Sequence, residues 1–147
     1  MLNEPYLTQI GRTIQLSVAP VFLLTAIGTT IAVLTNRLAR IVDRARILEE
    51  ERMASASAEG KVAIHSELAT LSKRAKLINL AITLGTICAL LICLMIAIMF
   101  IGVFLSLDLA IFVSILFVTA MLAFIGALFA FLREIFTAVK TLRIGMT

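Results

Sequence analysis

Long apolar runs separated by short polar segments dominate the pattern of this 147-residue chain. The runs cover residues 14–35, 77–105 and 109–132, and none of them contains Asp, Glu, Lys, Arg or His. A helix needs about 20 mostly apolar residues to cross the hydrocarbon core of a bilayer. The pattern therefore predicts three transmembrane helices, which are the first, second and third spans of the chain.

The polar segment 36–76 has a pattern of its own. Apolar residues recur three and four positions apart on two halves that match in reverse order. A small, polar, Gly-terminated stretch at 54–60 separates the halves, and Ser57 is suited to cap the returning helix. We expect an antiparallel coiled-coil hairpin, with a disordered loop as the alternative. The seam of the hairpin consists of Leu38, Ile41, Ala45, Leu48, Ile64, Leu68, Leu71 and Ala75.

The predicted fold is thus an all-α membrane protein. It has three transmembrane helices, and helices 1 and 2 extend into a cytoplasmic antiparallel helical hairpin. Residues 1–13 are expected to form an interfacial lead-in, and residues 133–147 a cytoplasmic tail. An extracytoplasmic turn at 106–108 separates the second and third spans, and Ser106 or Asp108 is expected to cap the third helix.

The distribution of charge predicts the orientation of the spans. Of the 13 Lys and Arg residues, nine lie in segment 36–76 and three in the tail, which leaves only Arg12 elsewhere. Short loops rich in Lys and Arg stay on the cytoplasmic side of a membrane. We therefore expect the N-terminus outside, and the hairpin and the C-terminus inside.

Charge is also segregated along the hairpin. Its tip, residues 49–67, carries five Glu against Arg52 and Lys61, whereas the part beside the membrane is basic. Basic residues beside a bilayer attract anionic lipids, so the expected partner is the lipid bilayer, and no nucleic acid is expected. This headgroup collar consists of Arg37, Arg40, Arg44, Arg46, Lys73, Arg74 and Lys76.

Small or weakly polar residues form a stripe along each span. Such stripes let membrane helices approach closely. We expect most of these residues to lie in contacts between the helices of the bundle. The alternative, which stays open, is a subunit interface or a Thr-lined pore. The first two helices contribute Thr25, Gly28, Thr29, Ala32, Asn36, Asn79, Thr83 and Thr86, and the third contributes Ala120, Ala123, Ala127, Ala130 and Glu134.

Residue types that carry chemistry are sparse. His65 is the single histidine, and Cys88 and Cys93 lie in an apolar run at a spacing that matches no metal site. We therefore expect no catalytic residue, cofactor or metal site, and no enzyme. The remaining hypotheses are a structural or regulatory membrane protein that self-associates or docks onto a larger membrane complex, and an oligomeric passive channel with a Thr-lined pore.

The run Asn-Arg-Leu-Ala-Arg-Ile-Val-Asp-Arg at 36–44 resembles a motif of a small bacterial membrane protein family. That family is described only as a domain of unknown function. The resemblance extends over nearly the whole chain, including residues 18–24 and 131–136. It implies a bacterial inner-membrane protein with three spans, and it implies no particular activity, ligand or site.

Overall fold

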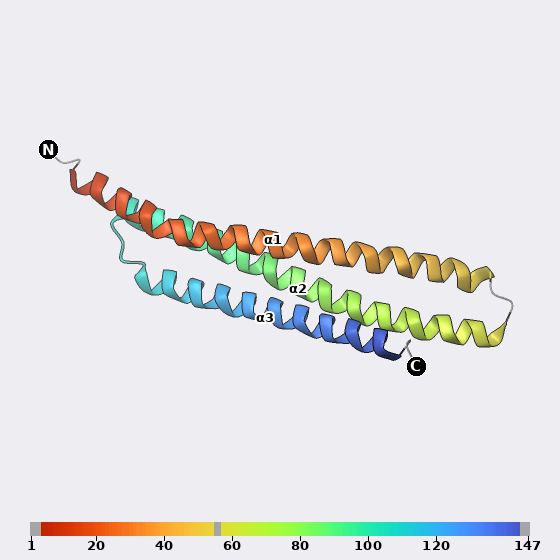
Figure 1. Ribbon diagram of the computed structural model, residues 1–147. Coiled ribbons are helices and arrows are strands. Elements are labelled where there is room, and N and C mark those ends of the chain that lie inside the picture. The colour runs from red at the N-terminus through yellow and green to blue at the C-terminus, as the bar shows by residue number, and fades with distance from the viewer. Residues whose placement is uncertain (1–3, 55–56, 145–147) are drawn as a thin grey trace. The chain divides into compact units, whose positions relative to one another are not determined.

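The computed structural model describes residues 4–54 and 57–144, with the side chains described as far as residue 140. Three helices follow one another: α1 (Glu4–Ala54), α2 (Ala58–Leu105) and α3 (Ala110–Ile144), as Figure 1 shows. Each helix is long and apolar enough to cross a membrane. The predicted all-α fold with three membrane-spanning helices is thereby confirmed; the described residues include no strand.

The helices are longer than the predicted spans. Helix α1 begins at Glu4, within the predicted lead-in, and continues through Pro20 to Ala54. Helix α3 passes the predicted end of the third span and includes residues of the predicted tail up to Ile144. Residues 1–3 of the lead-in, 55–56 of the hairpin turn and 145–147 of the tail lie outside the described residues.

Capping side chains explain where the helices begin. The hydroxyl of Ser57 accepts a hydrogen bond from the N–H of Gly60 at 3.2 Å, so Ser57 caps α2 as its type and position predicted. Asp108 Oδ1 accepts a hydrogen bond from the N–H of Ala110 at 3.2 Å. Of the two predicted candidates, Asp108 is therefore the residue that caps α3.

Ser106 instead ends α2. Its φ of 52° lies in the left-handed region, and it is the one non-glycine residue with positive φ in the described part of the chain. The N–H of Leu107 donates to the carbonyl of Gly102 at 3.0 Å, and the N–H of Ser106 donates to that of Val103 at 3.4 Å. These two bonds define a Schellman motif, in which glycine is the usual residue at the left-handed position.

The contacts divide the chain into two units, and each helix contributes to both. The first unit comprises Met1–Ile31 and Leu84–Ile125, and the second comprises Ala32–Thr83 and Gly126–Thr147. Each unit has its own apolar core. In the first, Ile27, Cys88, Ile92 and Ala120 form the buried cluster.

The core of the second unit is built from the seam residues. Ile41, Leu48 and Leu71 are 2–8% exposed, and they pack with Leu34, Ile78, Ala81 and Ala130. Within this unit the last part of α1 and the first part of α2 lie side by side, as Figure 1 shows. The remaining five seam residues pack against the same cluster: Leu38, Ala45, Ile64, Leu68 and Ala75.

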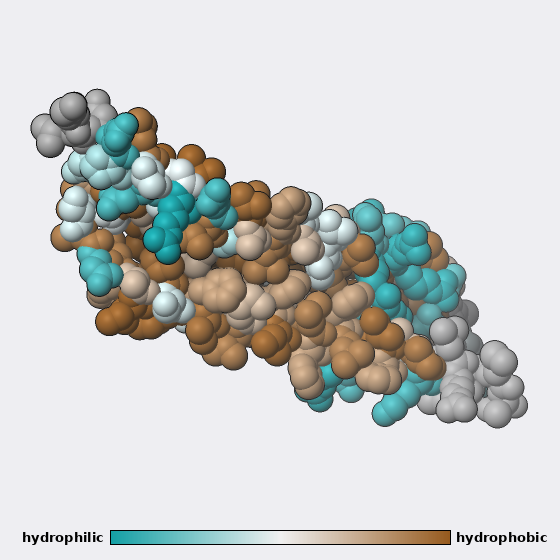
Figure 2. Space-filling view, turned by 60° about the vertical axis from the view of Figure 1, so that its left-hand side comes forward, coloured by the Kyte–Doolittle hydropathy of each residue, from teal (hydrophilic) through white to brown (hydrophobic). Residues whose placement is uncertain are grey.

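Most of the apolar surface remains uncovered by protein. In the most apolar window of each helix only 11–22% of the residues are buried. Large side chains such as Phe22 and Ile111 are more than 70% exposed. Figure 2 shows apolar residues over much of the visible face, with hydrophilic residues gathered in separate groups. Apolar surface on this scale is typical of helices that contact lipid.

Candidate functional site

The central feature of the second unit is a carboxylate buried between two arginines. Glu134 of α3 is 0% exposed. Arg74 Nε of α2 donates a hydrogen bond to Glu134 Oε1 at 3.0 Å, and Arg74 Nη2 lies 3.0 Å from the same oxygen. Arg37 Nη2 of α1 lies 2.8 Å from the other oxygen, Oε2. One carboxylate thereby connects all three helices, and we refer to Glu134, Arg37 and Arg74 as the ion triad.

The two arginines of the ion triad are held differently. Arg74 makes a charge-assisted hydrogen bond through Nε, and such bonds are stronger than those between neutral groups. Oε2 of Glu134 has no hydrogen-bond partner among the described residues, so its contact with Arg37 is a Coulombic attraction without hydrogen-bond geometry. The Arg37 guanidinium also lies 5.4 Å from the ring centre of Phe131, which is within the range of a cation–π interaction.

Some of the other basic residues of the second unit also form ion pairs. Arg44 of α1 pairs with Glu67 of α2 through Nη2 at 3.1 Å and Nε at 3.2 Å, and both side chains are at least 44% exposed. Arg52 pairs with Glu49 one turn away. The other four collar residues, Arg40, Arg46, Lys73 and Lys76, are exposed and make no ion pair with any described residue.

A cavity of about 320 Å³ lies among the arginines of the collar. Its walls come from α1 and α2 of the second unit, and two residues of the apolar seam contribute to them. The lining residues are Arg37, Arg40, Ile41, Arg44, Leu71 and Arg74.

The predicted small-residue stripes are exposed on α1 and α2 but mostly buried on α3. All eight stripe residues of α1 and α2 are exposed, in the first unit (Thr25, Gly28, Thr29, Thr86) and in the second (Ala32, Asn36, Asn79, Thr83) alike. The expectation that packing within the bundle uses most of the stripes is wrong for these two helices. On α3 it is right, because Ala120, Ala127, Ala130 and Glu134 are buried.

The hydroxyls of the exposed stripe are directed to their own helices. Thr29 Oγ1 donates to the carbonyl of Thr25 at 3.0 Å, and Thr83 Oγ1 donates to that of Asn79 at 2.9 Å. Such back-bonding satisfies the hydroxyl hydrogen inside an apolar medium and leaves the oxygen free to accept a further bond.

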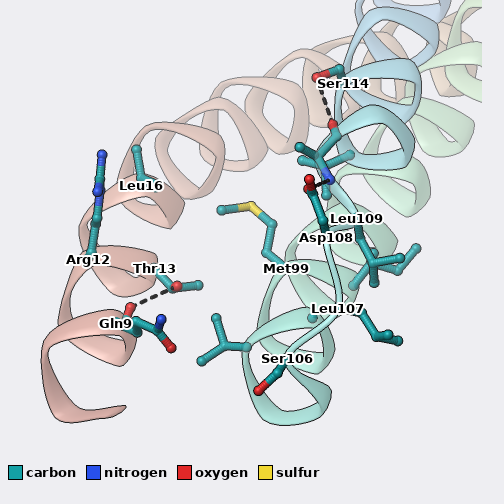
Figure 3. A pocket seen from close by; sticks show the side chains of 15 residues that line it. Gln9, Arg12, Thr13, Leu16, Met99, Ser106, Leu107, Asp108, Leu109 and Ser114 are labelled. Atoms are coloured by element: carbon teal, nitrogen blue, oxygen red, sulfur yellow. Dashed lines mark hydrogen bonds between the residues drawn. The ribbon is translucent and has the colours of Figure 1, made fainter. Parts of the chain in front are cut away.

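A second, larger cavity of about 640 Å³ lies at the α2–α3 turn in the first unit. Figure 3 shows Gln9, Arg12 and Thr13 of α1 on one side of it, with Ser106 and Asp108 of the turn on the other. The pattern of the sequence did not predict this cavity, because its polar residues come from three separate segments. No group of three or more His, Cys, Asp or Glu residues that could hold a metal ion occurs in the described part of the chain.

Comparison with known families identifies the family of the chain. The family described as "Protein of unknown function (DUF2721)" matches residues 17–144. The chain belongs to the DUF2721 family. Membership confirms the predicted resemblance to a domain of unknown function, and the match includes α2 and α3 entirely and all residues of the ion triad. No curated protein and no solved structure matches the chain.

The sequence pattern indicated the position of Glu134 in the fold but not its partners. The residue continues the alanine stripe of α3 at a spacing of four from Ala130, which correctly indicated an inward-facing position. The pattern held no signal for its partners, because Arg74 is 60 residues away along the chain. Among the seven collar residues, the structure therefore separates two that hold Glu134 from five that do not.

Proposed function

We propose that this protein is a structural or regulatory integral membrane protein that self-associates, or docks onto a larger membrane complex, through the stripe of α1 and α2. The observation that carries the proposal is the exposure of all eight stripe residues. They stay on the surface after the chain has folded, whereas the alanine stripe of α3 is used within the fold.

The chemistry of the stripe supports this role. In a bilayer, lipid tails are as apolar as side chains, so helices associate through close packing and hydrogen bonds rather than through the hydrophobic effect. Gly28 leaves a flat place on the surface of α1, because a Cβ added there would meet nothing within 4 Å apart from its chain neighbours and the local backbone of its own helix. Thr25 and Thr29 flank it and are exposed. Another helix can therefore approach the backbone of α1 closely at this point.

We further propose that the protein resides in a bacterial inner membrane with its N-terminus outside. The support is the charge bias, with twelve of 13 Lys and Arg residues in segments 36–76 and 133–147. Single cysteines at Glu59 and Leu107, in a background that lacks Cys88 and Cys93, would test it with a membrane-impermeant maleimide. Labelling at position 107 and protection at position 59 in intact cells are expected, and the reverse pattern would overturn the orientation.

Two exposed glycines provide a matched test of self-association. Gly28 lies in the stripe and Gly11 does not. A Cβ added at either position would meet nothing within 4 Å apart from its chain neighbours and the local backbone of α1. Gly28→Leu and Gly11→Leu should therefore both leave the monomer fold intact, and both add a bulky side chain to α1. Native mass spectrometry in a mild detergent, with native membranes as the source, would report the assembly state.

Loss of assembly in Gly28→Leu, with Gly11→Leu unchanged, is the expected result. It applies equally to a homo-oligomer and to a complex with another membrane protein, and the measured masses distinguish the two. A wild-type protein that is monomeric and free of any partner protein would refute the proposal.

The exposed threonines favour a second candidate, an oligomeric passive channel. The hydroxyls of Thr25, Thr29 and Thr83 donate to carbonyls of their own helix, so their oxygens can line an aqueous path as acceptors. Flux of small ions through liposomes that contain the purified protein is the discriminating assay. Absence of flux under an imposed gradient would eliminate the channel. Neither candidate involves enzymatic chemistry, and we propose none.

A further inference from the structure

Four arginines line the cavity of about 320 Å³ in the second unit. Arg37, Arg40 and Arg44 are three and four residues apart, so they share one face of α1 with Ile41. Arg74 reaches the cavity from α2, three residues after Leu71. Ile41 and Leu71 are only 5% and 8% exposed, so the arginines lie beside an apolar floor.

The charge at this cavity is not balanced by the chain. The single negative charge of Glu134 is shared between Arg37 and Arg74, and Glu67 pairs with Arg44. Arg40 has no ion pair with any described residue. Four positive charges thus face two negative ones. Like charges three and four residues apart on a helix repel one another, so an anion in the cavity would relieve that repulsion.

Three of the four arginines are already held in position. Arg74 is hydrogen-bonded to the buried carboxylate of Glu134, and Arg37 lies between Glu134 and the ring of Phe131. Arg44 is hydrogen-bonded to Glu67. Side chains that are ordered before a ligand arrives reduce the entropy lost on binding.

The size and charge of the cavity point to a phosphate group. The planar guanidinium presents a fork of N–H donors that matches phosphate oxygens. A phosphomonoester carries a charge of about −1.5 to −2 at neutral pH, which corresponds to the excess positive charge. The volume of about 320 Å³ is at the lower end of the range for small-molecule sites, which leaves room for a headgroup or a free phosphate.

We propose that this cavity, lined by Arg37, Arg40, Arg44 and Arg74, is a binding site for a phosphate group. The site is distinct from a diffuse basic surface, because it uses four of the seven collar residues in a defined geometry. It does not depend on self-association, since its residues are separate from the stripe. The phosphate can come from a lipid headgroup, which rests on the proposed membrane location, or from the aqueous phase.

The chain offers a matched pair of variants for the test. Arg40 and Arg46 are both exposed residues of α1 without an ion pair among the described residues, but only Arg40 lines the cavity. Arg40→Gln and Arg46→Gln remove the same charge from the same segment. Neither residue belongs to the ion triad, so both variants should fold, which far-UV circular dichroism of the full-length protein would check.

Two probes distinguish the source of the phosphate. Inorganic phosphate and short-chain dihexanoyl phosphatidic acid would be titrated separately into the full-length protein in a neutral detergent, by isothermal titration calorimetry. Arg40→Gln is expected to weaken binding about tenfold or more, the effect of one charge-assisted hydrogen bond, and Arg46→Gln less than about twofold. Tighter binding of the phosphatidic acid assigns the site to a lipid headgroup, and equal or tighter binding of inorganic phosphate assigns it to a soluble phosphate.

Either assignment supports the site. Absence of saturable binding with both probes would overturn it. Equal weakening by Arg40→Gln and Arg46→Gln would also overturn it, because only a diffuse basic surface treats the two positions alike. A monomeric protein that still binds phosphate through Arg40 would refute self-association and leave this site intact.

Discussion

Replacement of Glu134 by Gln should destabilise the protein far more than the same change at an exposed ion pair. Gln keeps the volume of the side chain and one oxygen acceptor, so the substitution removes mainly the negative charge. In the folded protein that charge is 0% exposed and faces both Arg37 and Arg74. The variant would leave the two guanidinium groups against each other without a carboxylate between them.

The magnitude follows from burial. Removal of one partner from a fully buried pair costs about 3–5 kcal/mol. The Arg37 and Arg74 side chains are 35% and 21% exposed, so each can turn its charge partly toward water. We therefore expect Glu134→Gln to lower the free energy of unfolding by about 2–3 kcal/mol.

Glu67→Gln is the matched control. Arg44 approaches Glu67 through Nε and Nη2 on one oxygen, the same arrangement that Arg74 has with Glu134. The exposed pair differs in burial, with side-chain exposures of 49% and 44%, and in having one arginine where Glu134 has two. Exposed pairs contribute about 0.2–1 kcal/mol, so this variant should lose no more than that.

The assay is equilibrium unfolding of the full-length protein in mixed detergent micelles, followed by far-UV circular dichroism. All three proteins should begin with the same helical content. A cost for Glu134→Gln that does not exceed the cost for Glu67→Gln would refute the reasoning, because neither the burial of Glu134 nor its second arginine would then have an energetic consequence. An additional Arg74→Gln change should recover part of the loss, since it removes one of the two unpaired charges.

Three further predictions use the same unfolding assay. Ser106→Gly should stabilise the protein by about 0.5–1 kcal/mol, because glycine adopts the φ of 52° without steric cost; destabilisation would show that the serine side chain is needed at the end of α2. Leu48→Ala should cost about 2–4 kcal/mol, since Leu48 is 2% exposed, whereas Ile47→Ala, at 48% exposure, should cost less than about 1 kcal/mol; equal losses would contradict the assigned core. Asp108→Ala should cost about 0.5–1 kcal/mol through loss of the bond to the Ala110 N–H, and no change would mean that the cap contributes nothing.

Much of the fold was predictable because the relevant signals are local. Hydropathy over a window of neighbouring residues identified the three apolar helices, and α2 ends at Leu105, the last residue of the predicted second span. The spacing of Ile41, Leu48 and Leu71 indicated which faces of α1 and α2 are apolar, and all three residues are buried. Ser57 was predictable as a cap because capping depends on a residue type and on its position at a helix start.

The candidate sites were less predictable, because they depend on which helix faces meet. The stripe containing Thr25 and Gly28 and the stripe containing Ala127 and Ala130 have similar composition, yet the first is exposed and the second is buried. Composition alone could not separate them, since small residues suit both an internal contact and an external one.

The sequence by itself determined that this chain forms three long apolar helices with a basic segment between the first two. It did so because membrane-spanning helices and their flanking charges follow from the free energy of transferring each residue between water and lipid. Only the tertiary structure decided that Glu134 lies between Arg37 and Arg74, and that four arginines share one cavity. Those contacts join residues far apart in the chain, and the packing of the three helices within the second unit brings them together.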